Sequence, residues 1–193
     1  MRKGRKQEMY KELYELVLEE HRKVFEAQPR KDLDALMKAV AEAGRIFVFG
    51  AGREGIAARS FAMRIMHLGK DTFWLLDDTT PGMREGDLFI AVNGSGKIGY
   101  IDYFLDQARK TGAKIAVITG APTERTPSEA DVNVFVPAAV YKGTDPRVVP
   151  SAQPMGNLYE QHLFLLFDIL VMMLEKKMKL THEQMESRHR NVE

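Results

Sequence analysis

The sequence contains no cysteine, which excludes a disulfide framework, a thiolate metal site and a cysteine nucleophile together. It also lacks a long apolar run: the longest, from Leu163 to Leu174, is interrupted by Asp168 and is too short to span a bilayer. An excess of one charge is absent too, because 28 Lys and Arg residues stand against 27 Asp and Glu residues. These absences predict a cytoplasmic protein that binds neither nucleic acid nor a membrane.

The length and composition of the chain fit one compact domain. Its 193 residues are 45 % hydrophobic, which is enough to build a sizeable core. We expect N-terminal helices over residues 1–44, an α/β core over 45–180, and a C-terminal helix and tail over 181–193.

Apolar residues near the N-terminus recur at three- and four-residue spacing, which is typical of amphipathic helices. The first stripe comprises Tyr10, Leu13, Tyr14, Val17, Leu18, Val24 and Phe25, and the second comprises Leu33, Leu36, Met37 and Val40. The second helix should end before Gly44. An apolar stripe is not left in water, so the first helix must cover either its own domain or another subunit.

From Arg45 onward the pattern changes to short, nearly continuous apolar runs bounded by turn residues. The runs are Ile46–Phe49, Thr72–Leu76, Leu88–Val92, Ile115–Ile118 and Val132–Val136. Helices are predicted between them at about Glu54–Leu68 and Gly99–Thr111. Such runs indicate strands of a parallel sheet covered on both faces, so the predicted architecture is a three-layer α/β/α sandwich with five parallel strands.

The remaining segments are predicted to be one loop and two helices. The stretch Pro137–Pro154 shows little periodicity and reads as an ordered loop, after which an apolar helix begins near Gly156. Thr181 and Gln184 have the spacing of a capping box, which predicts a short final helix.

A first glycine-rich loop, Gly50–Gly55, follows the first predicted strand with the spacing G-x-G-x-x-G. This spacing occurs in dinucleotide-binding proteins, which also need an acidic residue after the second strand. Asp77 and Asp78 stand there. A dehydrogenase is therefore one interpretation, although it explains neither the leading helices nor the second glycine loop.

The second loop, Asn93-Gly94-Ser95-Gly96-Lys97, follows the third predicted strand and precedes a helix. Glycines allow tight backbone turns, Ser95 offers a hydroxyl, and a helix start offers unpaired N–H groups with positive potential. Together they suit a phosphate, sulfonate or carboxylate. Both loops should lie at the carboxyl ends of parallel strands, where ligands of such sheets bind.

Glu160 shares a stripe of the apolar helix with Leu163, Phe164 and Phe167. A carboxylate on a buried face is costly, and partial desolvation would raise its proton affinity toward that of a general base. Alternatively, Glu160 lies in the first helical turn, where the helix dipole favours a solvated carboxylate. The residues alone leave both interpretations open.

The histidines have mostly structural interpretations. His67 stands near a helix end, His21 and His162 are unremarkable, and His189 lies in the polar stretch Arg188–Asn191. No spacing of histidines or carboxylates indicates a metal site.

Several motifs in one order resemble the sugar isomerase (SIS) domain family, most closely the 6-phospho-3-hexuloisomerases. They are Gly50-Ala51-Gly52-Arg53 with Gly55, Phe61-Ala62-Met63-Arg64, Met66-His67-Leu68-Gly69, Thr79-Thr80-Pro81, Glu85-Gly86-Asp87-Leu88, Gln153-Pro154-Met155-Gly156 with Glu160, and Arg188-His189 with Asn191. The resemblance covers nearly the whole chain. It implies a flavodoxin-like sheet, a cofactor-free isomerase of an anionic hexose, and a homotetramer with active sites between subunits.

The resemblance also implies residue roles. Glu160 matches the carboxylate that moves a proton between adjacent sugar carbons through a cis-enediol, and His189 matches a terminal histidine that reaches a neighbouring subunit's site. The expected substrate-binding residues are Gly52, Arg53, Glu54, Thr80, Asn93, Gly94, Ser95, Gly96, Lys97 and Gln153.

The anion loop departs from the family pattern. Where the hexuloisomerases usually read Ser-Gly-Ser-Gly, followed by Glu or Arg and then Thr, this chain reads Asn93-Gly94-Ser95-Gly96-Lys97-Ile98, and Glu54 replaces a frequent serine. Lys97 or Arg53 could supply compensating positive charge. Three interpretations remain: a phosphate held by backbone N–H groups, a sulfonate of a sulfosugar, or a sugar-phosphate sensor without turnover. Glu160 and His189 argue against the sensor.

Overall fold

The structure is a computed structural model that describes residues 2–192, with side chains from residue 6 onward. Five parallel strands form one sheet in the order β2-β1-β3-β4-β5. The strands are β1 Arg45–Gly50, β2 Asp71–Trp74, β3 Leu88–Val92, β4 Lys114–Thr119 and β5 Val132–Phe135. All five residues of β3 are buried, which explains why its sequence is continuously apolar. The predicted flavodoxin-like sheet is confirmed.

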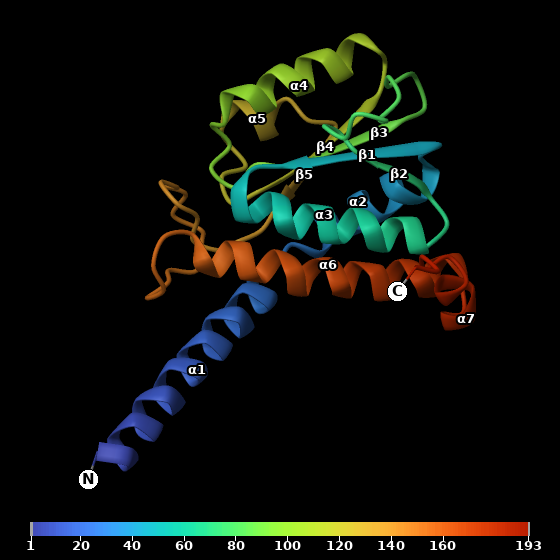
Figure 1. The fold of residues 1–193 in the computed structure, drawn as a ribbon. Coiled ribbons are helices and arrows are strands. Elements are labelled where there is room, and N and C mark those ends of the chain that lie inside the picture. The colour runs from blue at the N-terminus through green and yellow to red at the C-terminus, as the bar shows by residue number, and fades with distance from the viewer. Residues whose placement is uncertain (1, 193) are drawn as a thin grey trace.

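Helices cover both faces of this sheet (Figure 1). They are α1 Arg2–Ala27, α2 Arg30–Glu42, α3 Gly52–His67, α4 Gly99–Lys110, α5 Arg125–Ser128, α6 Asn157–Met178 and α7 His182–Glu186. One hydrophobic cluster joins the sheet to α2, α3 and α6, and another joins the opposite face to α4. The predicted three-layer α/β/α architecture is therefore confirmed.

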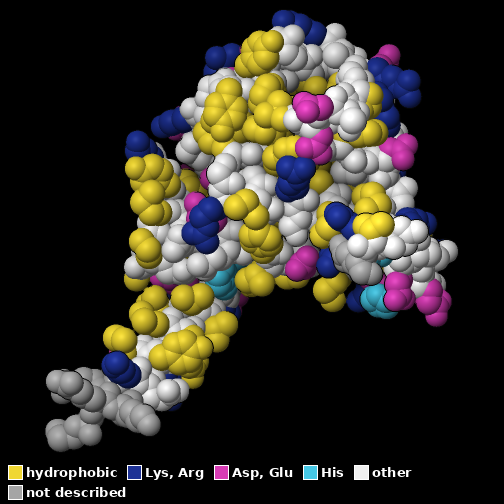
Figure 2. Space-filling view, in the orientation of Figure 1, with side chains coloured by type: hydrophobic (Ala, Val, Ile, Leu, Met, Phe, Trp, Pro, Cys, Tyr) yellow, Lys and Arg dark blue, Asp and Glu magenta, His cyan; other side chains and the backbone are white. Residues whose placement is uncertain are grey.

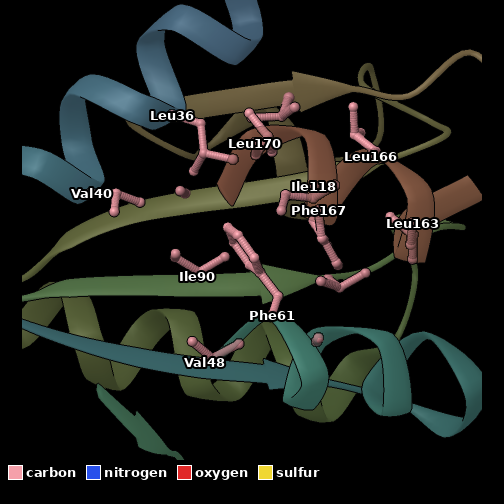
Figure 3. Close-up of a cluster of buried hydrophobic side chains, with 14 of the residues drawn as sticks. Leu36, Val40, Val48, Phe61, Ile90, Ile118, Leu163, Leu166, Phe167 and Leu170 are labelled. Carbon is pink, nitrogen blue, oxygen red and sulfur yellow. The ribbon is translucent and has the colours of Figure 1, made fainter. Parts of the chain in front are cut away.

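The larger core lies between the sheet and the pair α3 and α6 (Figure 3). The rings of Phe61 on α3 and Phe167 on α6 stack with their centroids 4.4 Å apart. Leu163, Leu166 and Leu170 on α6 are also buried. This packing fixes the beginning of α6, and with it Glu160, relative to the loop that starts α3.

Element boundaries differ from the predicted ones by a few residues. Strand β2 ends at Trp74 instead of Leu76, because Asp77 N and the Thr80 hydroxyl both donate to the Trp74 carbonyl and turn the chain. Helix α3 begins at Gly52, two residues earlier than expected. Residues 125–128 form the additional short helix α5, whereas 137–154 contains only an isolated bridge, Ala138 to Val149. The capping box of Thr181 and Gln184 is present.

Helix α1 projects away from the rest of the molecule (Figure 1). Its C-terminal end is anchored, since Glu20, His21 and Val24 are buried. Its outer part carries exposed apolar side chains, which form a patch along the projecting helix (Figure 2). They are Met9, Tyr10, Leu13, Tyr14, Leu16 and Leu18.

Helix α6 is long and apolar enough to cross a membrane, with 22 residues and a mean hydropathy of 1.2. Half of its most apolar window is nevertheless buried inside the fold. Because that buried face packs on α3 and the sheet, α6 is a core helix of the α/β sandwich.

Candidate active site

The two glycine-rich loops lie at the carboxyl ends of β1 and β3, which are neighbours in the sheet. The chain leaves β1 toward β2 on one side, while β3, β4 and β5 continue on the other. The crevice at such a switch point is where ligands of open α/β sheets bind. Helix α6 begins near the same edge of the sheet, since Asn157 and Glu160 contact Arg53.

In the first loop, Gly50 and Gly55 allow the strand and helix α3 to touch. A Cβ atom on Gly55 would lie 2.4 Å from the Gly50 carbonyl oxygen, and one on Gly50 would lie 3.0 Å from Gly55 Cα. Gly52 has a φ of 53°, which favours glycine. The G-x-G-x-x-G spacing is thus explained by close backbone packing. Asp77, which the dehydrogenase interpretation needs for a ribose, is paired instead with Arg59 at 2.9 Å.

Arg53 connects the start of α3 to the start of α6. Its Nη1 atom lies 2.8 Å from Glu160 Oε2 and donates a hydrogen bond to Asn157 Oδ1 at 2.6 Å. The Glu160 side chain is 18 % exposed. Its Oε2 atom has this ion-pair contact but accepts no hydrogen bond of good geometry from any described residue. Glu160 is therefore a charge-paired carboxylate whose buried oxygen Oε2 has no hydrogen-bond partner among the described residues.

Glu54, which follows Arg53 in the sequence, extends its side chain to the second loop. Its Oε2 atom accepts a hydrogen bond from Gly94 N at 2.8 Å. Burial raises the pKa of Glu54 to about 7, the Gly94 hydrogen bond opposes that rise, and the charge of Glu160 adds to it. The phenol of Tyr159 is fully buried and donates to the Ile118 carbonyl at 3.0 Å. Burial, together with the charge of Glu54, raises the pKa of that phenol as well.

Other residues of the second loop contact Thr126 and Glu124. Asn93 is fully buried and its amide donates to Thr126 Oγ1 at 3.2 Å, so its side chain supports the loop from inside. Gly96 has a φ of 68°. Lys97 Nζ lies 3.0 Å from Glu124 Oε1. Ser95 Oγ is partly exposed and accepts only a long contact of 3.4 Å from Lys97 N.

Sequence comparison identifies the family to which this arrangement belongs. The family profile of the SIS domain matches residues 39–152, which span the sheet and both glycine loops. The chain belongs to the SIS domain family. This membership replaces the dehydrogenase interpretation of the first loop.

Two relatives in this family are named 3-hexulose-6-phosphate isomerase. The one from Mycobacterium gastri is 36 % identical over 158 residues, covering 82 % of this chain and 78 % of the relative. The one from Bacillus subtilis is 33 % identical over 163 residues, covering 84 % and 88 %. A crystal structure of a Methanococcus jannaschii protein, for which that function has been inferred, aligns with a TM-score of 0.80 at 26 % identity, covering 94 % and 99 %.

Thr80 and Gln153, two further predicted substrate-binding residues, also contact other parts of the chain. Thr80 Oγ1 donates to the Trp74 carbonyl at 2.7 Å and so closes the turn after β2. Gln153 Nε2 donates to Glu20 Oε2 at 2.9 Å. Glu20 also accepts from Ser151 Oγ and Ala152 N, both at 2.7 Å. The loop that leads into α6 is thereby tied to the anchored end of α1.

His189 lies at the opposite end of the SIS fold from Glu160. Glu160 stands in the first turn of α6, whereas His189 follows α7, which packs beyond the far end of α6 (Figure 1). Its ring stacks on that of His67 with centroids 5.3 Å apart. Both histidines line a hollow together with Arg64, Asp168 and Glu175. The fold of one chain does not bring the two predicted catalytic residues together.

Sequence reasoning missed Asn157, Tyr159 and Glu124, which touch the site. Asn157 stands three residues before Glu160, so it shares a helix face with that carboxylate, and this spacing could have indicated it. Tyr159 and Glu124 act through long-range contacts to the second loop. No local pattern in the sequence reveals those contacts.

Proposed function

We propose that the chain is a sugar-phosphate isomerase that interconverts 3-hexulose 6-phosphate and its 2-ketose isomer, which is the activity its named relatives suggest. Those relatives confirm the prediction from the sequence that the chain is a sugar isomerase. The reaction moves a carbonyl group between adjacent carbons, and it needs a base that removes a proton beside the carbonyl and returns it to the neighbouring carbon.

Glu160 is the proposed base. The observation that carries this proposal is the position of its carboxylate, mostly shielded, paired with Arg53 and beside the second loop. Substrate would bind with its anionic group at Gly94–Lys97 and its carbonyl region toward Glu160. One carboxylate oxygen takes the proton from C2 while the carbonyl oxygen on C3 gains a proton, which gives a cis-enediol. The same carboxyl then returns its proton to C3 while the C2 hydroxyl loses its proton and becomes the new carbonyl, so that between the two oxygens one proton passes from the C2 oxygen to the C3 oxygen. Arg53 orients the carboxylate before substrate arrives, through the 2.8 Å ion pair between the two side chains.

Replacing Glu160 with Gln tests this assignment. Glu160→Gln keeps the size of the side chain but removes the base, so turnover should fall by at least about a thousandfold. Turnover is measured by isomerisation of fructose 6-phosphate and by deuterium uptake from solvent. Asp106→Asn, at an exposed surface pair on α4, is the matched control and should keep full activity. Turnover retained in Glu160→Gln would remove Glu160 as the base.

We also propose a homo-oligomer in which His189 of one copy completes the site of another. Two features support association: the apolar patch on projecting α1, and exposed Leu165, Ile169 and Met172, which share one face of α6. Size-exclusion chromatography with light scattering measures the assembly, for which a tetramer is expected. Co-expression of Glu160→Gln with His189→Ala should restore part of the activity that each variant lacks. No restoration would contradict shared sites.

The identity of the anion is a separate part of the proposal. Phosphate is favoured by the names of the relatives, while the carboxylate of Glu54 on the loop keeps a monoanionic sulfonate as the second candidate. Thermal-shift measurements with fructose 6-phosphate, sulfoquinovose and uncharged hexoses separate the two. Stabilisation without deuterium exchange for any of these sugars would instead indicate a sensor. A cytoplasmic location remains a prediction.

A further inference from the structure

The second loop offers an anion fewer free positive groups than its sequence suggests. Two cations of the site already have carboxylate partners: Arg53 lies 2.8 Å from Glu160, and Lys97 lies 3.0 Å from Glu124. The N–H of Gly94 is occupied as well, by Glu54 Oε2 at 2.8 Å. An arriving anion must therefore share this loop with a carboxyl group of the protein itself.

The Glu54 carboxyl fits tightly against the loop. A Cβ on Gly94 would lie 2.8 Å from Tyr159 Cε1 and would collide with Glu54 Oε1. The absence of a side chain at Gly94 is what admits this carboxyl, and the buried Tyr159 ring forms the wall behind it. Glu54 thus occupies a place, next to a loop N–H, that an anionic ligand would otherwise use.

We propose that Glu54 makes anion binding at the second loop proton-linked: the anion of the substrate binds there only when Glu54 carries a proton. This inference rests on the proposed function only in placing the substrate's anion at that loop. Binding takes one proton from solvent onto Glu54 Oε1 and forms no covalent bond. The neutral acid can then donate a hydrogen bond to the anion while Oε2 still accepts from Gly94 N.

The surroundings of Glu54 favour this proton uptake. From α6 it faces the charge of Glu160 and the phenol of Tyr159, and from the second loop it faces the Gly94 N–H. Arg53, its neighbour on α3, is directed to Glu160 and Asn157. Burial and Glu160 already hold the pKa of Glu54 near 7, and a bound anion would raise it further, because like charges disfavour each other's ionised forms.

Sulfate is a suitable probe, since it keeps its charge of minus two across the neutral range whereas phosphate itself titrates there. Sulfate affinity is measured by calorimetry on the full chain. If only the protonated form of Glu54 admits the anion, the dissociation constant should rise about tenfold between about pH 6 and about pH 8. Calorimetry in buffers of different ionisation enthalpy should show uptake of close to one proton at the higher pH.

Two variants isolate Glu54. Glu54→Gln is neutral at every pH and can still accept from Gly94 N, so its sulfate affinity should be constant across this range and should match that of the parent at low pH. Glu124→Gln removes the same charge beside Lys97 and should keep the tenfold dependence. Glu54→Ser is a second variant without the carboxyl, should Glu54→Gln melt at a lower temperature.

The outcomes are distinct. The proposal is overturned if the sulfate affinity of the parent does not change with pH, or if the tenfold pH dependence survives in Glu54→Gln. It is also overturned if Glu124→Gln loses the pH dependence equally, or if sulfate binds to neither the parent nor Glu54→Gln. Sulfate binding requires no turnover, so its result stands apart from the isomerase assay. Proton-linked binding without isomerisation would remove the proposed function and leave the role of Glu54.

Discussion

The two glycine-rich loops stand side by side at the same edge of the sheet, yet their glycines serve different purposes. In the first loop Gly50 and Gly55 bring two pieces of backbone into contact, and a side chain on Gly55 would strike a carbonyl oxygen. In the second loop Gly94 admits the end of a side chain, the Glu54 carboxyl. One loop is built for packing and the other for a polar group.

Because of this difference, the glycines of the first loop should matter for the stability of the fold, and those of the second loop for anion binding. Backbone cannot move away from an added Cβ without shifting β1 or α3, whereas a carboxyl at the end of a flexible side chain can rotate. Substitutions in the first loop should therefore damage the fold, and those in the second should chiefly change what the loop holds.

The largest effect is expected from Gly55→Ala. Its Cβ would lie 2.4 Å from the Gly50 carbonyl oxygen, so the free energy of unfolding should fall by about 3 kcal/mol. Urea denaturation measures this change. Gly99→Ala is the control, because a Cβ there meets nothing within 4 Å at the first residue of α4, and stability should change by less than about 1 kcal/mol. Equal stability of the two variants would contradict the packing role of Gly55.

Gly94→Ala should cost less stability, about 2 kcal/mol, because one of its two close contacts is the movable Glu54 carboxyl. The other contact, Tyr159, is buried and remains. In a Glu54→Ala background the cost of Gly94→Ala should therefore be smaller by about 1 kcal/mol, since neighbouring side chains couple. A double-mutant cycle by urea denaturation measures this coupling. If the stability costs of Gly94→Ala and Glu54→Ala simply add, Tyr159 alone requires glycine at position 94.

Much of the fold could be predicted from the sequence, because it depends on local patterns. The buried strands are continuous apolar runs. The capping box formed by Thr181 and Gln184 marks the start of α7, and its two residues lie only three positions apart in the sequence. The contacts of the site join distant residues instead: Glu54 meets a loop N–H forty positions away, and Gln153 meets Glu20. The sequence could place Glu54 near the loop, but only the fold shows that its carboxylate accepts a hydrogen bond from the N–H of Gly94.

The stability of the fold should depend on pH through Glu54. An acid whose pKa is about 7 when folded, against an ordinary value of 4.5, holds its proton more tightly in the folded state. Its contribution is therefore fully present below about pH 4.5 and is lost progressively as pH rises from there through about 7. Between about pH 5 and about pH 8 the parent should lose about 2–2.5 kcal/mol relative to Glu54→Gln. The free energy of unfolding of the parent and of Glu54→Gln is measured by urea denaturation at several pH values. If the two proteins show the same pH dependence, Glu54 does not hold a proton in the folded state.

The smallest effect on stability, below about 0.5 kcal/mol, is expected from Lys97→Ala, because its ion pair with Glu124 is half exposed. Its effect on binding decides how the second loop holds an anion. If the backbone of Gly94–Gly96 is the main ligand, removing Lys97 should weaken sulfate by only about threefold, and added salt should erase the difference. A loss of a hundredfold or more would make Lys97 the principal ligand. The second loop would then bind through a side chain, and its glycines, like those of the first loop, would matter chiefly for packing.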